Sequence, residues 1–571
     1  MENKAIPASE GISIAKVFKF ETVEIKTEKT VIKNVEEALS DLKKAMQTAV
    51  EEVIVIRDHT QKTMGVESAA IFDAHIQIIE DPEIFNEVKT TMESESYNAA
   101  YAYDIVTKKY ISLFESMEDN AYMQERAADV KDVSKRVLAK LLDIDLPNPL
   151  SINSDVIVVA HDLTPSDTAQ LNKQYVKGFI TEIGGKTSHS AIMARMLEIP
   201  AIVGAKKIVS QVNQDDLMVL DGLTGVYFIN PKPALCEEYK EKQTEFLKEK
   251  QRLKTLVNEK SITKDKHQVE IAANIGSDED IDSVLQNGAE GVGLYRTEFL
   301  YMNSSSMPSE TVQFEAYKKV LESMPNQKVI IRTLDIGGDK KLDYLEMNEE
   351  MNPFLGCRAV RLCMEEIEIF KTQLRALLKA SYYGDLHIMF PMIATVDELI
   401  EAKKVLKNCE KELIEENTPI GDYKVGIMIE IPSTIFIAKH LAAHCDFFSI
   451  GTNDLIQYTF AADRMNETVA YLYQPFHPSI LNMIKMVIDA AHEAGIWTGM
   501  CGEMAQEYKA LPILLGLGLD EFSMSPSSIL KSREAIRSMD FKKAQTLALE
   551  VLSYKDEAEV LKRLEEEENN G

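Results

Sequence analysis

Charged and reactive side chains stand directly after apolar runs at several points in the C-terminal half of the chain. Arginine, carboxylate and thiol groups are the ones that bind phosphate, hold divalent cations and transfer protons. One such position can arise by chance, but five at the ends of apolar runs favour a shared catalytic site. They are Arg296, Arg332 with Asp335, Glu430, Asn453 with Asp454, and Cys501 with Glu503.

The arginines indicate an anionic substrate. Arg296 and Arg332 follow successive apolar runs, and both have acidic residues close by in the sequence. A guanidinium group matches the geometry of phosphate and carboxylate oxygens, so the pair is typical of a site for a ligand with two or three negative charges. Arg358 is a third candidate. A single arginine in such a position more often makes a structural ion pair.

Glu430 and Asp454 are candidate metal ligands. They follow neighbouring apolar runs, and no cluster of Cys and His lies near them in the sequence. Oxygen ligands of this kind favour Mg²⁺, with Mn²⁺ as an alternative, over zinc. Such a cation would bridge a substrate phosphate and assist P–O cleavage. The alternative is that one of the two carboxylates is a general base and that no metal is bound.

Cys501 is the candidate reactive thiol. It lies in GMCGE, where the glycines allow a ligand to approach closely. The residue types alone leave two roles open, nucleophile or proton donor. No histidine is near it in the sequence, so a Cys–His nucleophile is not supported.

His189 is the candidate phosphate acceptor outside this group. It lies in GGKTSHSAIMAR, after a strand-like run and a Gly-Gly turn, with Thr187 and Ser188 as possible helix caps. Main-chain N–H groups and the helix dipole favour a phosphate at such a position. On position alone, a histidine near a helix start is more often a surface residue. It also belongs to a different predicted domain from the arginines.

The secondary structure expected around the arginines, the carboxylates and Cys501 indicates a (β/α)₈ barrel. Eight apolar runs alternate with helical stretches, as expected for parallel strands buried on both faces. Enzymes of this fold build their active sites at the C-terminal ends of the strands, where these polar residues fall. The runs are 269–276, 291–296, 328–335, 386–392, 425–432, 446–451, 496–503 and 520–525.

The N-terminal half predicts an α/β domain interrupted by helices. Residues 1–20 alternate as short strands, and from about Val35 to Leu142 the apolar residues recur at helical spacing, with breaks near Asp81-Pro82 and at ESESYN. This pattern indicates a helical insert of three or four helices. After a linker at 145–153, strands alternate with a helix at 188–198, and 232–260 is typical of one charged connecting helix.

Composition limits the kinds of partner. The chain has 571 residues, 63 basic against 92 acidic side chains, and a net charge of −29. This charge argues against nucleic acid and anionic lipid and favours a basic protein partner. The six cysteines show no disulfide spacing, and the sequence has neither a signal-peptide core nor an apolar run of about 18 residues. The expected location is the cytoplasm, without membrane insertion.

Several long motifs, in order along the chain, closely resemble enzyme I of the bacterial phosphoenolpyruvate:sugar phosphotransferase system. The helical insert also resembles that family, in IFDAHIQIIEDP and QERAADVKDVSKRVL. Agreement over so much of the chain is far more specific than a single glycine fingerprint. The other motifs are GGKTSHSAIMAR, GVGLYRTEFLYM, IRTLDIGGDK with NPFLGCRAVR, DFFSIGTNDLIQYTFAADR and GMCGEMA.

The resemblance implies a phosphoryl relay from phosphoenolpyruvate to a histidine of the enzyme, and then to a histidine of the phosphocarrier protein HPr, with release of pyruvate. It implies that His189 is phosphorylated, that Thr168 orients its ring, and that Cys501 protonates the enolate. It also implies the ligands of the substrate and the metal. Arg296, Arg332, Asn453, Asp454 and Arg464 would bind phosphoenolpyruvate, with Arg358 in support, and Glu430 and Asp454 would hold Mg²⁺.

Patterns and resemblance together divide the chain into domains. Residues 1–22 and 146–230 would form a swivelling phosphohistidine α/β domain, and 23–145 the HPr-binding helical insert. Residues 231–260 would be a linker helix, and 261–571 the phosphoenolpyruvate-binding barrel. A carrier histidine must be loaded at the barrel and unloaded at the insert, which is why its domain should swivel. The resemblance further implies a homodimer through the barrel, which no residue pattern shows.

Two features depart from the family or lie outside it. Cys357 in NPFLGCRAVR stands where the family usually carries an aromatic residue, which puts the packing beside Arg358 in question. The acidic tail LEEEENNG is expected to be disordered.

Other readings compete with the resemblance. A pyruvate, phosphate dikinase or a phosphoenolpyruvate synthase would need a further ATP-binding domain and a glycine-rich loop, which this chain lacks. A non-catalytic regulator would not need His189, Cys501 and the carboxylate pair together.

Overall fold

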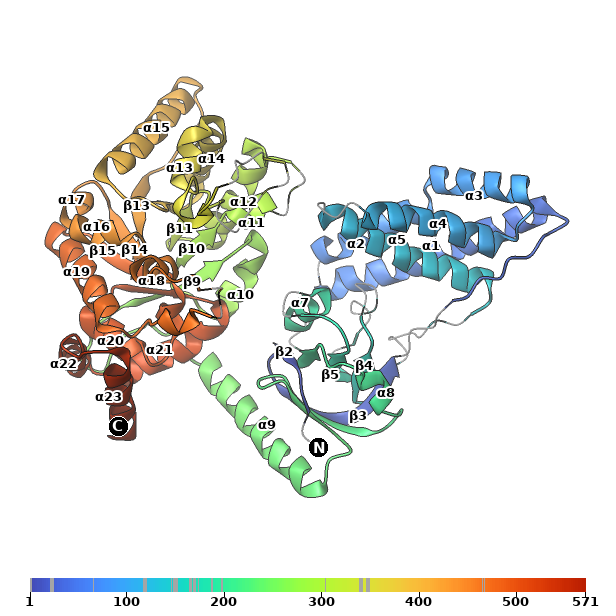
Figure 1. The fold of residues 1–571 in the computed structure, drawn as a ribbon, viewed down its shortest axis with the longest axis horizontal. Coiled ribbons are helices and arrows are strands. Elements are labelled where there is room, and N and C mark those ends of the chain that lie inside the picture. Colours follow the sequence, from blue (N-terminus) through green and yellow to red (C-terminus); the bar gives the residue numbers. More distant parts are fainter. Residues whose placement is uncertain are drawn as a thin grey trace. The chain divides into compact units, whose positions relative to one another are not determined.

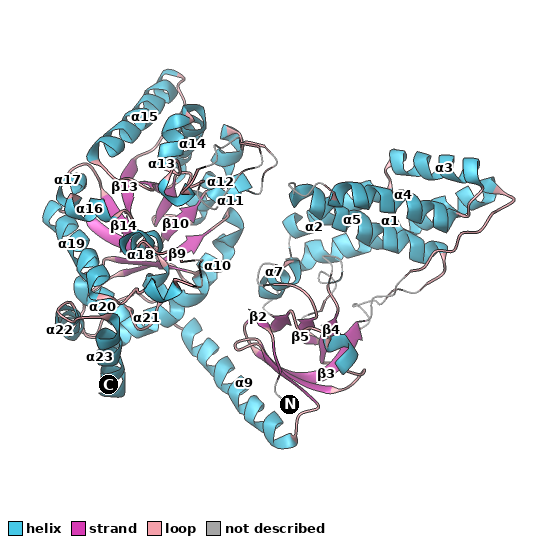
Figure 2. Cartoon of the chain, in the orientation of Figure 1, coloured by secondary structure: helices cyan, strands magenta, loops and turns pink. Residues whose placement is uncertain are grey.

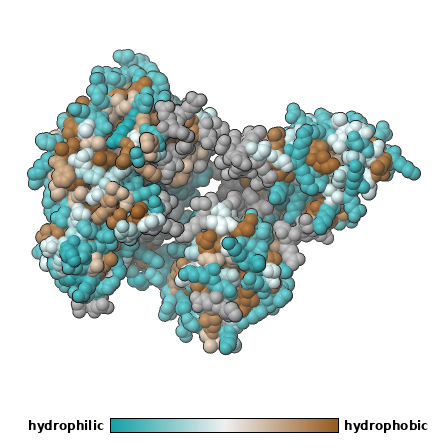
Figure 3. Space-filling view, in the orientation of Figure 1, coloured by the Kyte–Doolittle hydropathy of each residue, from teal (hydrophilic) through white to brown (hydrophobic). Residues whose placement is uncertain are grey.

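The computed structural model describes residues 3–20, 25–64, 66–116, 121–144, 146, 152–163, 167, 171–172, 174–185, 188–196, 199–302, 304, 306–337, 342, 344–345, 350–464, 466 and 468–570. It contains two compact units, Met1–Lys250 and Gln251–Gly571. Figure 1 traces both along the chain, and polar residues cover much of the face drawn in Figure 3.

The first unit contains a mixed sheet whose described strands run in the order β1-β8-β7-β3-β4-β5-β6-β2. The long strand β3 pairs in parallel with β4 and antiparallel with β7, so the beginning of the chain lies in the middle of a sheet formed mostly by later residues. Two apolar clusters bury its two faces. The strands are β1 Asn3–Lys4, β2 Ile6–Ser9, β3 Ile12–Phe20, β4 Val156–Ala160, β5 Val176–Thr181, β6 Ala201–Val203, β7 Leu217–Asp221 and β8 Val226–Ile229.

The helical part of this unit packs around its own apolar core. Asp81 caps α3 by accepting the Glu83 N–H, with Pro82 at the first helical position, which explains the break expected there. The described residues form five helices rather than three or four, because only one residue separates α1 from α2 and the apolar repeat continues across it. They are α1 Val35–Met64, α2 Val66–Ile79, α3 Pro82–Glu95, α4 Ala99–Glu115 and α5 Ala121–Leu141.

Among the described residues, three further helices lie around the sheet and in the connection to the second unit. The last is long and charged, as the sequence predicts. They are α7 His189–Met196, α8 Ile208–Gln211 and α9 Pro233–Lys254.

The second unit contains a closed parallel barrel whose described strands run β10-β11-β12-β13-β14-β15-β16-β9. Figure 2 shows these strands enclosed by helices. Each of the eight predicted runs overlaps one strand, and two of the strands, β12 and β13, begin one or two residues before their runs, so the predicted fold class is confirmed. The strands are β9 Glu270–Ile275, β10 Val292–Arg296, β11 Lys328–Arg332, β12 Asp385–Phe390, β13 Tyr423–Ile429, β14 Phe447–Ile450, β15 Trp497–Met500 and β16 Glu521–Met524.

Side chains of the barrel strands alternate between an inner layer and an outer layer that packs on the helices. The middle of the inner layer is apolar and includes Leu294, Ile330, Met389, Met428 and Phe447. The charged residues therefore lie toward the two ends of the barrel, on either side of this apolar layer.

The helices of the second unit follow the strands in turn. They are α10 Ile281–Gln286, α11 Glu298–Met302, α12 Glu310–Ser323, α13 Val360–Glu365, α14 Ile367–Ala380, α15 Val396–Glu415, α16 Pro432–Phe436, α17 Ala438–Ala442, α18 Thr452–Phe460, α19 Pro478–Ala494, α20 Leu511–Leu517, α21 Ile529–Ser538, α22 Phe541–Val551 and α23 Glu557–Asn570. Short 3₁₀ helices are η2 Asp278–Asp280, η3 Pro353–Leu355, η4 Ser381–Tyr383, η5 Ala470–Leu472, η6 Glu503–Gln506 and η7 Pro526–Ser528.

The acidic tail corrects one expectation. LEEEENNG is predicted to be disordered, but α23 extends to Asn570. Val560 and Leu564 are buried at helical spacing, and Arg563 pairs with Glu550 and Glu567. The prediction was wrong because it weighed the glutamates and overlooked the apolar stripe that anchors them.

Candidate active site

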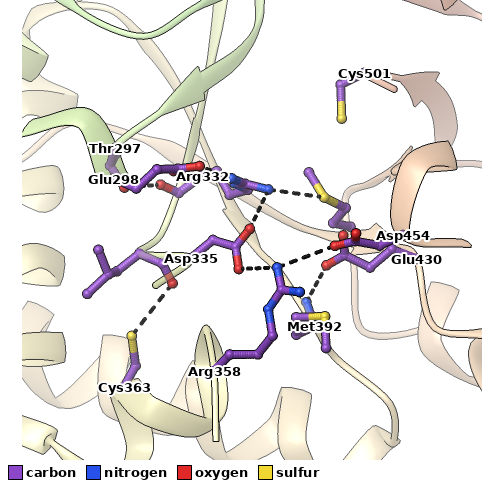
Figure 4. A network of polar contacts seen from close by, with 12 residues as sticks. Thr297, Glu298, Arg332, Asp335, Arg358, Cys363, Met392, Glu430, Asp454 and Cys501 are labelled. Carbon is purple, nitrogen blue, oxygen red and sulfur yellow. Dashed lines mark hydrogen bonds and ion pairs between the residues drawn. The ribbon is translucent and has the colours of Figure 1, made fainter. Parts of the chain in front are cut away.

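The C-terminal ends of the barrel strands bring most of the predicted site residues together (Figure 4). Arg296 ends β10 and Arg332 ends β11, and the two lie opposite each other in the parallel register. Thr297 follows Arg296 and donates its hydroxyl to the Arg332 carbonyl at 2.9 Å, which ties the two strand ends together. The barrel thus presents two guanidinium groups from adjacent strands.

A chain of buried ion pairs connects the arginines to the carboxylates. Asp335 bridges two of them, because Arg332 Nη1 lies 2.9 Å from Asp335 Oδ2 and Arg358 Nη2 lies 2.9 Å from Asp335 Oδ1. Arg358 Nη2 also lies 3.3 Å from Asp454 Oδ2, and Arg332 pairs with Glu298 as well. These contacts fix both guanidinium groups before any substrate arrives.

Charge and burial act in opposite directions on these arginines. Burial alone would lower the pKa of Arg332, but the carboxylates of Glu298, Asp335 and Glu430 raise it above the ordinary value. The same balance raises the pKa of Arg358, again against the effect of burial. Both side chains therefore stay cationic in a site with little water.

Glu430 and Asp454 lie close to each other within this network. Glu430 is 2% exposed, and its Oε1 accepts the Met392 N–H at 2.6 Å. Burial, followed by the charges of Asp454 and Asp335, raises the pKa of Glu430 to about 8. A carboxylate under this much repulsion favours a compensating positive charge.

The site provides some of the ligands that a hard divalent cation such as Mg²⁺ requires. A side chain at Gly451 would place its Cβ 3.0 Å from Glu430 Oε2, so the glycine leaves room for the carboxylate. Among the described residues no group of three or more His, Cys, Asp and Glu side chains is arranged to hold a metal. Two carboxylates alone match Mg²⁺, which typically takes one or two from the protein and the rest from substrate oxygens and water.

Asn453 and Arg464 complete the predicted substrate ligands. The Asn453 Oδ1 accepts the Glu503 N–H at 3.2 Å and the Tyr473 hydroxyl at 3.4 Å, which orients the amide. Arg464 is exposed in a turn after α18. Arg296 has no side-chain ion pair or hydrogen bond within the described part of the chain. Its guanidinium is therefore available to bind an anion.

Cys501 follows β15 on the inner face of the barrel and is 4% exposed. Burial raises the pKa of its thiol to about 11, against a smaller lowering by a hydrogen bond with Ser449 and minor effects of neighbouring charges. The group is therefore a neutral thiol at neutral pH, which suits a proton donor better than a thiolate nucleophile. The chain is tightly placed here, since a Cβ at Gly502 would lie 1.9 Å from Thr452 Oγ1.

His189 belongs to the first unit, whereas the barrel residues belong to the second. His189 begins α7 in the first unit, and Ser188 Oγ accepts the Ala191 N–H at 3.4 Å, as a capping residue does. The His189 side chain, Thr187 and Thr168 lie outside the described residues.

Residues that the sequence analysis missed support Arg358. Its guanidinium lies 5.8 Å from the Phe354 ring centre and 3.3 Å from the Tyr458 hydroxyl, which in turn donates to the Phe354 carbonyl at 2.6 Å. The aromatic contact beside Arg358 thus comes from Phe354, while Cys357 turns to Glu365, with 3.0 Å between Sγ and Oε2. Glu298 was also missed, although its position two residues after a strand-end arginine is a usable signal.

Comparison with known proteins gives matches over almost the entire chain. Family models described as PEP-utilising enzyme match in three segments: the N-terminal part at 4–126, the mobile domain at 152–225 and the PEP-binding domain at 250–541. The phosphoenolpyruvate-protein phosphotransferase of Staphylococcus carnosus is 52% identical, covering 99% of each chain. That of Bacillus subtilis is also 52% identical, over 98% of each chain.

The chain belongs to the phosphoenolpyruvate-protein phosphotransferase family. It is therefore an enzyme, and the resemblance inferred from its motifs is confirmed. A solution structure of an Enzyme I protein (nEIt) is 39% identical, covers 43% of this chain and 98% of its own, and has a TM-score of 0.40. Among the described residues no helix has the length and apolar content needed to cross a bilayer.

Proposed function

We propose that this phosphotransferase moves the phosphoryl group of phosphoenolpyruvate to His189 and from there to a histidine of the phosphocarrier HPr, the first step of a sugar phosphotransferase system. The observation that carries the proposal is the barrel mouth, where Arg296 and Arg332 lie in register beside the buried pair Glu430 and Asp454. These residues would supply positive charges for a polyanion and two carboxylates for a divalent cation.

Substrate binding would divide among several side chains. Arg296 and Arg332 would bind phosphate and carboxylate oxygens, helped by Asn453, Asp454 and the exposed Arg464. Asp335 and Arg358 would hold the arrangement rigid. Mg²⁺, or Mn²⁺, held by Glu430 and Asp454, would offset the charge of the phosphoryl group.

The chemistry would proceed as a phosphoryl transfer followed by a protonation. The P–O bond of phosphoenolpyruvate breaks and a P–N bond forms with the His189 imidazole, whose ring Thr168 would orient. The enolate left behind takes a proton at its methylene carbon from the Cys501 thiol and becomes pyruvate. The thiolate then regains a proton from solvent.

The partners follow from the same relay. HPr would dock on the helical insert, 23–145, and the α/β domain of 1–22 and 146–230 would swivel between it and the barrel of 261–571 on the linker 231–260. The net charge of −29 favours a basic carrier. We propose a homodimer through the barrel and a cytoplasmic location.

Labelled phosphoenolpyruvate tests the relay. The wild-type protein should take up acid-labile phosphate and pass it to HPr, whereas His189→Ala should do neither. Because the barrel holds the substrate, His189→Ala should bind phosphoenolpyruvate within about tenfold of the wild type, or 1.4 kcal/mol. A wild type that binds phosphoenolpyruvate but takes up no phosphate would instead be a regulator.

Cys501→Ser tests the acid. A hydroxyl is a far weaker acid than a thiol, so pyruvate formation should slow strongly while His189 is still phosphorylated. Enolpyruvate would then be protonated in solution without stereochemical preference. A trapped phosphocysteine in the wild type would contradict the acid role.

A further inference from the structure

The main chain of Cys501 is held from both sides by the barrel. Its N–H donates to the Ile450 carbonyl of β14 at 3.2 Å, in line with the β14–β15 pairing. Its carbonyl accepts the side-chain amide of Asn274, from β9, at 3.1 Å. Strand β16 lies between β15 and β9 in the barrel. The Asn274 side chain therefore reaches past β16 to the Cys501 carbonyl.

The Asn274 side chain is committed to this one arrangement. Its Nδ2 donates to the Cys501 carbonyl and also to the Ser523 carbonyl at 3.3 Å. Its Oδ1 accepts the Ser523 hydroxyl at 2.6 Å, and Ser523 is fully buried. Both amide donors are therefore in use, and Asn274 has no donor left for a substrate.

The barrel makes room for this pair at a glycine. A Cβ on Gly293 of β10 would lie 2.3 Å from Ser523 Oγ and 2.5 Å from Ser523 Cβ. A larger residue at Gly293 would push Ser523 away from Asn274. The contact between β9, β15 and β16 thus depends on small and polar residues in an inner layer that is otherwise apolar.

We propose that Asn274, supported by Ser523, is a positioning residue that fixes the main chain of Cys501 so that its thiol is aimed at the methylene carbon of the bound enolate. This inference rests on the proposed role of Cys501 as the acid. The thiol has one rotatable bond from the main chain, so a shift of the peptide moves the donor directly. A misplacement of about 1 Å can cost on the order of 10²-fold in rate.

The experiment is a double-mutant cycle in the full-length protein with Mg²⁺. Asn274→Ala, and the isosteric Asn274→Asp that cannot donate to the carbonyls, should slow pyruvate formation by on the order of 10²-fold. The KM for phosphoenolpyruvate should change by less than about threefold, because the side chains proposed to bind the substrate are unchanged. Ser523→Ala keeps the Asn274 donors and should cost only about fivefold.

The coupling to Cys501 separates positioning from a general structural role. In a Cys501→Ser background, Asn274→Ala should slow pyruvate formation by less than about twofold, because the group it positions is already gone. Gln313→Ala is the matched control, since Gln313 is a fully buried amide of α12 that donates to the Pro308 carbonyl at 2.9 Å, away from Cys501. It should leave pyruvate formation unchanged.

Two different outcomes would overturn the inference, one through the positioning role of Asn274 and the other through the acid role of Cys501. If Cys501→Ser is slow but Asn274→Ala costs the same in both backgrounds, the positioning role alone is wrong. If Cys501→Ser forms pyruvate at the wild-type rate, the acid role falls, and the inference falls with it.

Discussion

The two ends of the barrel interior both contain buried charges, yet they are arranged in different ways. At the N-terminal end, the ammonium group of Lys328 lies 2.7 Å from Glu521 Oε2, also pairs with Glu270, and lies 3.7 Å from the centre of the Trp497 ring. Trp497 also stacks on Phe447. One cation is thus enclosed by two carboxylates and an aromatic ring.

At the C-terminal end, buried ion pairs stand beside an arginine that has no such partner among the residues that the structure describes. Arg296 has no side-chain partner in the described part of the chain, and the pKa of Glu430 is raised to about 8. A cavity of about 490 Å³ lies at the N-terminal end, lined by Glu270, Lys328, His387 and Trp497 among others, but its cation is already paired. Buried charge alone therefore does not mark a site, because both ends of the barrel contain buried ion pairs. The C-terminal end differs in Arg296, an arginine without a side-chain partner among the described residues.

One strand supplies a cation to each end. Lys328, Ile330 and Arg332 of β11 alternate with outward residues, so all three point into the barrel. Lys328 reaches the closed end and Arg332 the open end. Replacing Lys328 or Arg332 by Met therefore removes one buried cation from either end of the barrel, on the same strand.

Arg332→Met should have the largest effect. It removes a guanidinium that we place on the phosphoryl group, and the loss of one such donor costs about 10²–10³-fold in kcat. We expect steady-state assays to show kcat/KM for phosphoenolpyruvate reduced by at least about 10³-fold, since binding is lost as well. Wild-type activity would mean that the open end is not the substrate site.

Lys328→Met should leave activity intact and lower stability. It leaves the fully buried Glu521 without its cation, and breaking a buried pair typically costs about 3–5 kcal/mol. Denaturant unfolding should show the loss, and Glu521→Gln in the same chain should recover part of it. If kcat/KM fell as far as in Arg332→Met, the division between the two ends would be wrong.

The pH dependence of stability should differ when Mg²⁺ is added. In metal-free protein, Glu430 keeps its proton up to a pKa of about 8, while the unfolded chain loses it near 4.5. The folded state then binds more protons between these values, so the free energy of unfolding should fall as pH rises through that window. Added Mg²⁺ should reduce this loss of stability at higher pH. Glu430→Gln should abolish both the pH dependence and the response to Mg²⁺. An equal response to Mg²⁺ in Glu430→Gln would place the cation elsewhere.

The smallest expected effect is on the fluorescence of Trp497, the only tryptophan in the chain. It lies at the closed end, separated from the mouth by the apolar inner layer. Saturating phosphoenolpyruvate and Mg²⁺ should leave its emission maximum unmoved, whereas Lys328→Met should shift it. A ligand-induced shift would show that the two ends are coupled.

Much of the fold could be predicted from local patterns. The eight apolar runs identify the barrel strands because parallel strands buried on both faces have no polar face to obscure them. The break at Asp81-Pro82 follows from capping chemistry. The tail helix was missed because its stability depends on Val560 and Leu564 packing against distant residues.

The sequence by itself determined which residue types stand at the strand ends, and hence the identity of Arg296, Arg332, Glu430, Asp454 and Cys501 as site candidates. Only the tertiary structure decided their partners: that Asp335 bridges Arg332 and Arg358, that Phe354 replaces the expected aromatic contact, and that Asn274 holds Cys501. The physical reason is sequence separation. Asn274 and Cys501 are 227 residues apart, and only barrel closure brings the first and seventh strands close enough for one hydrogen bond.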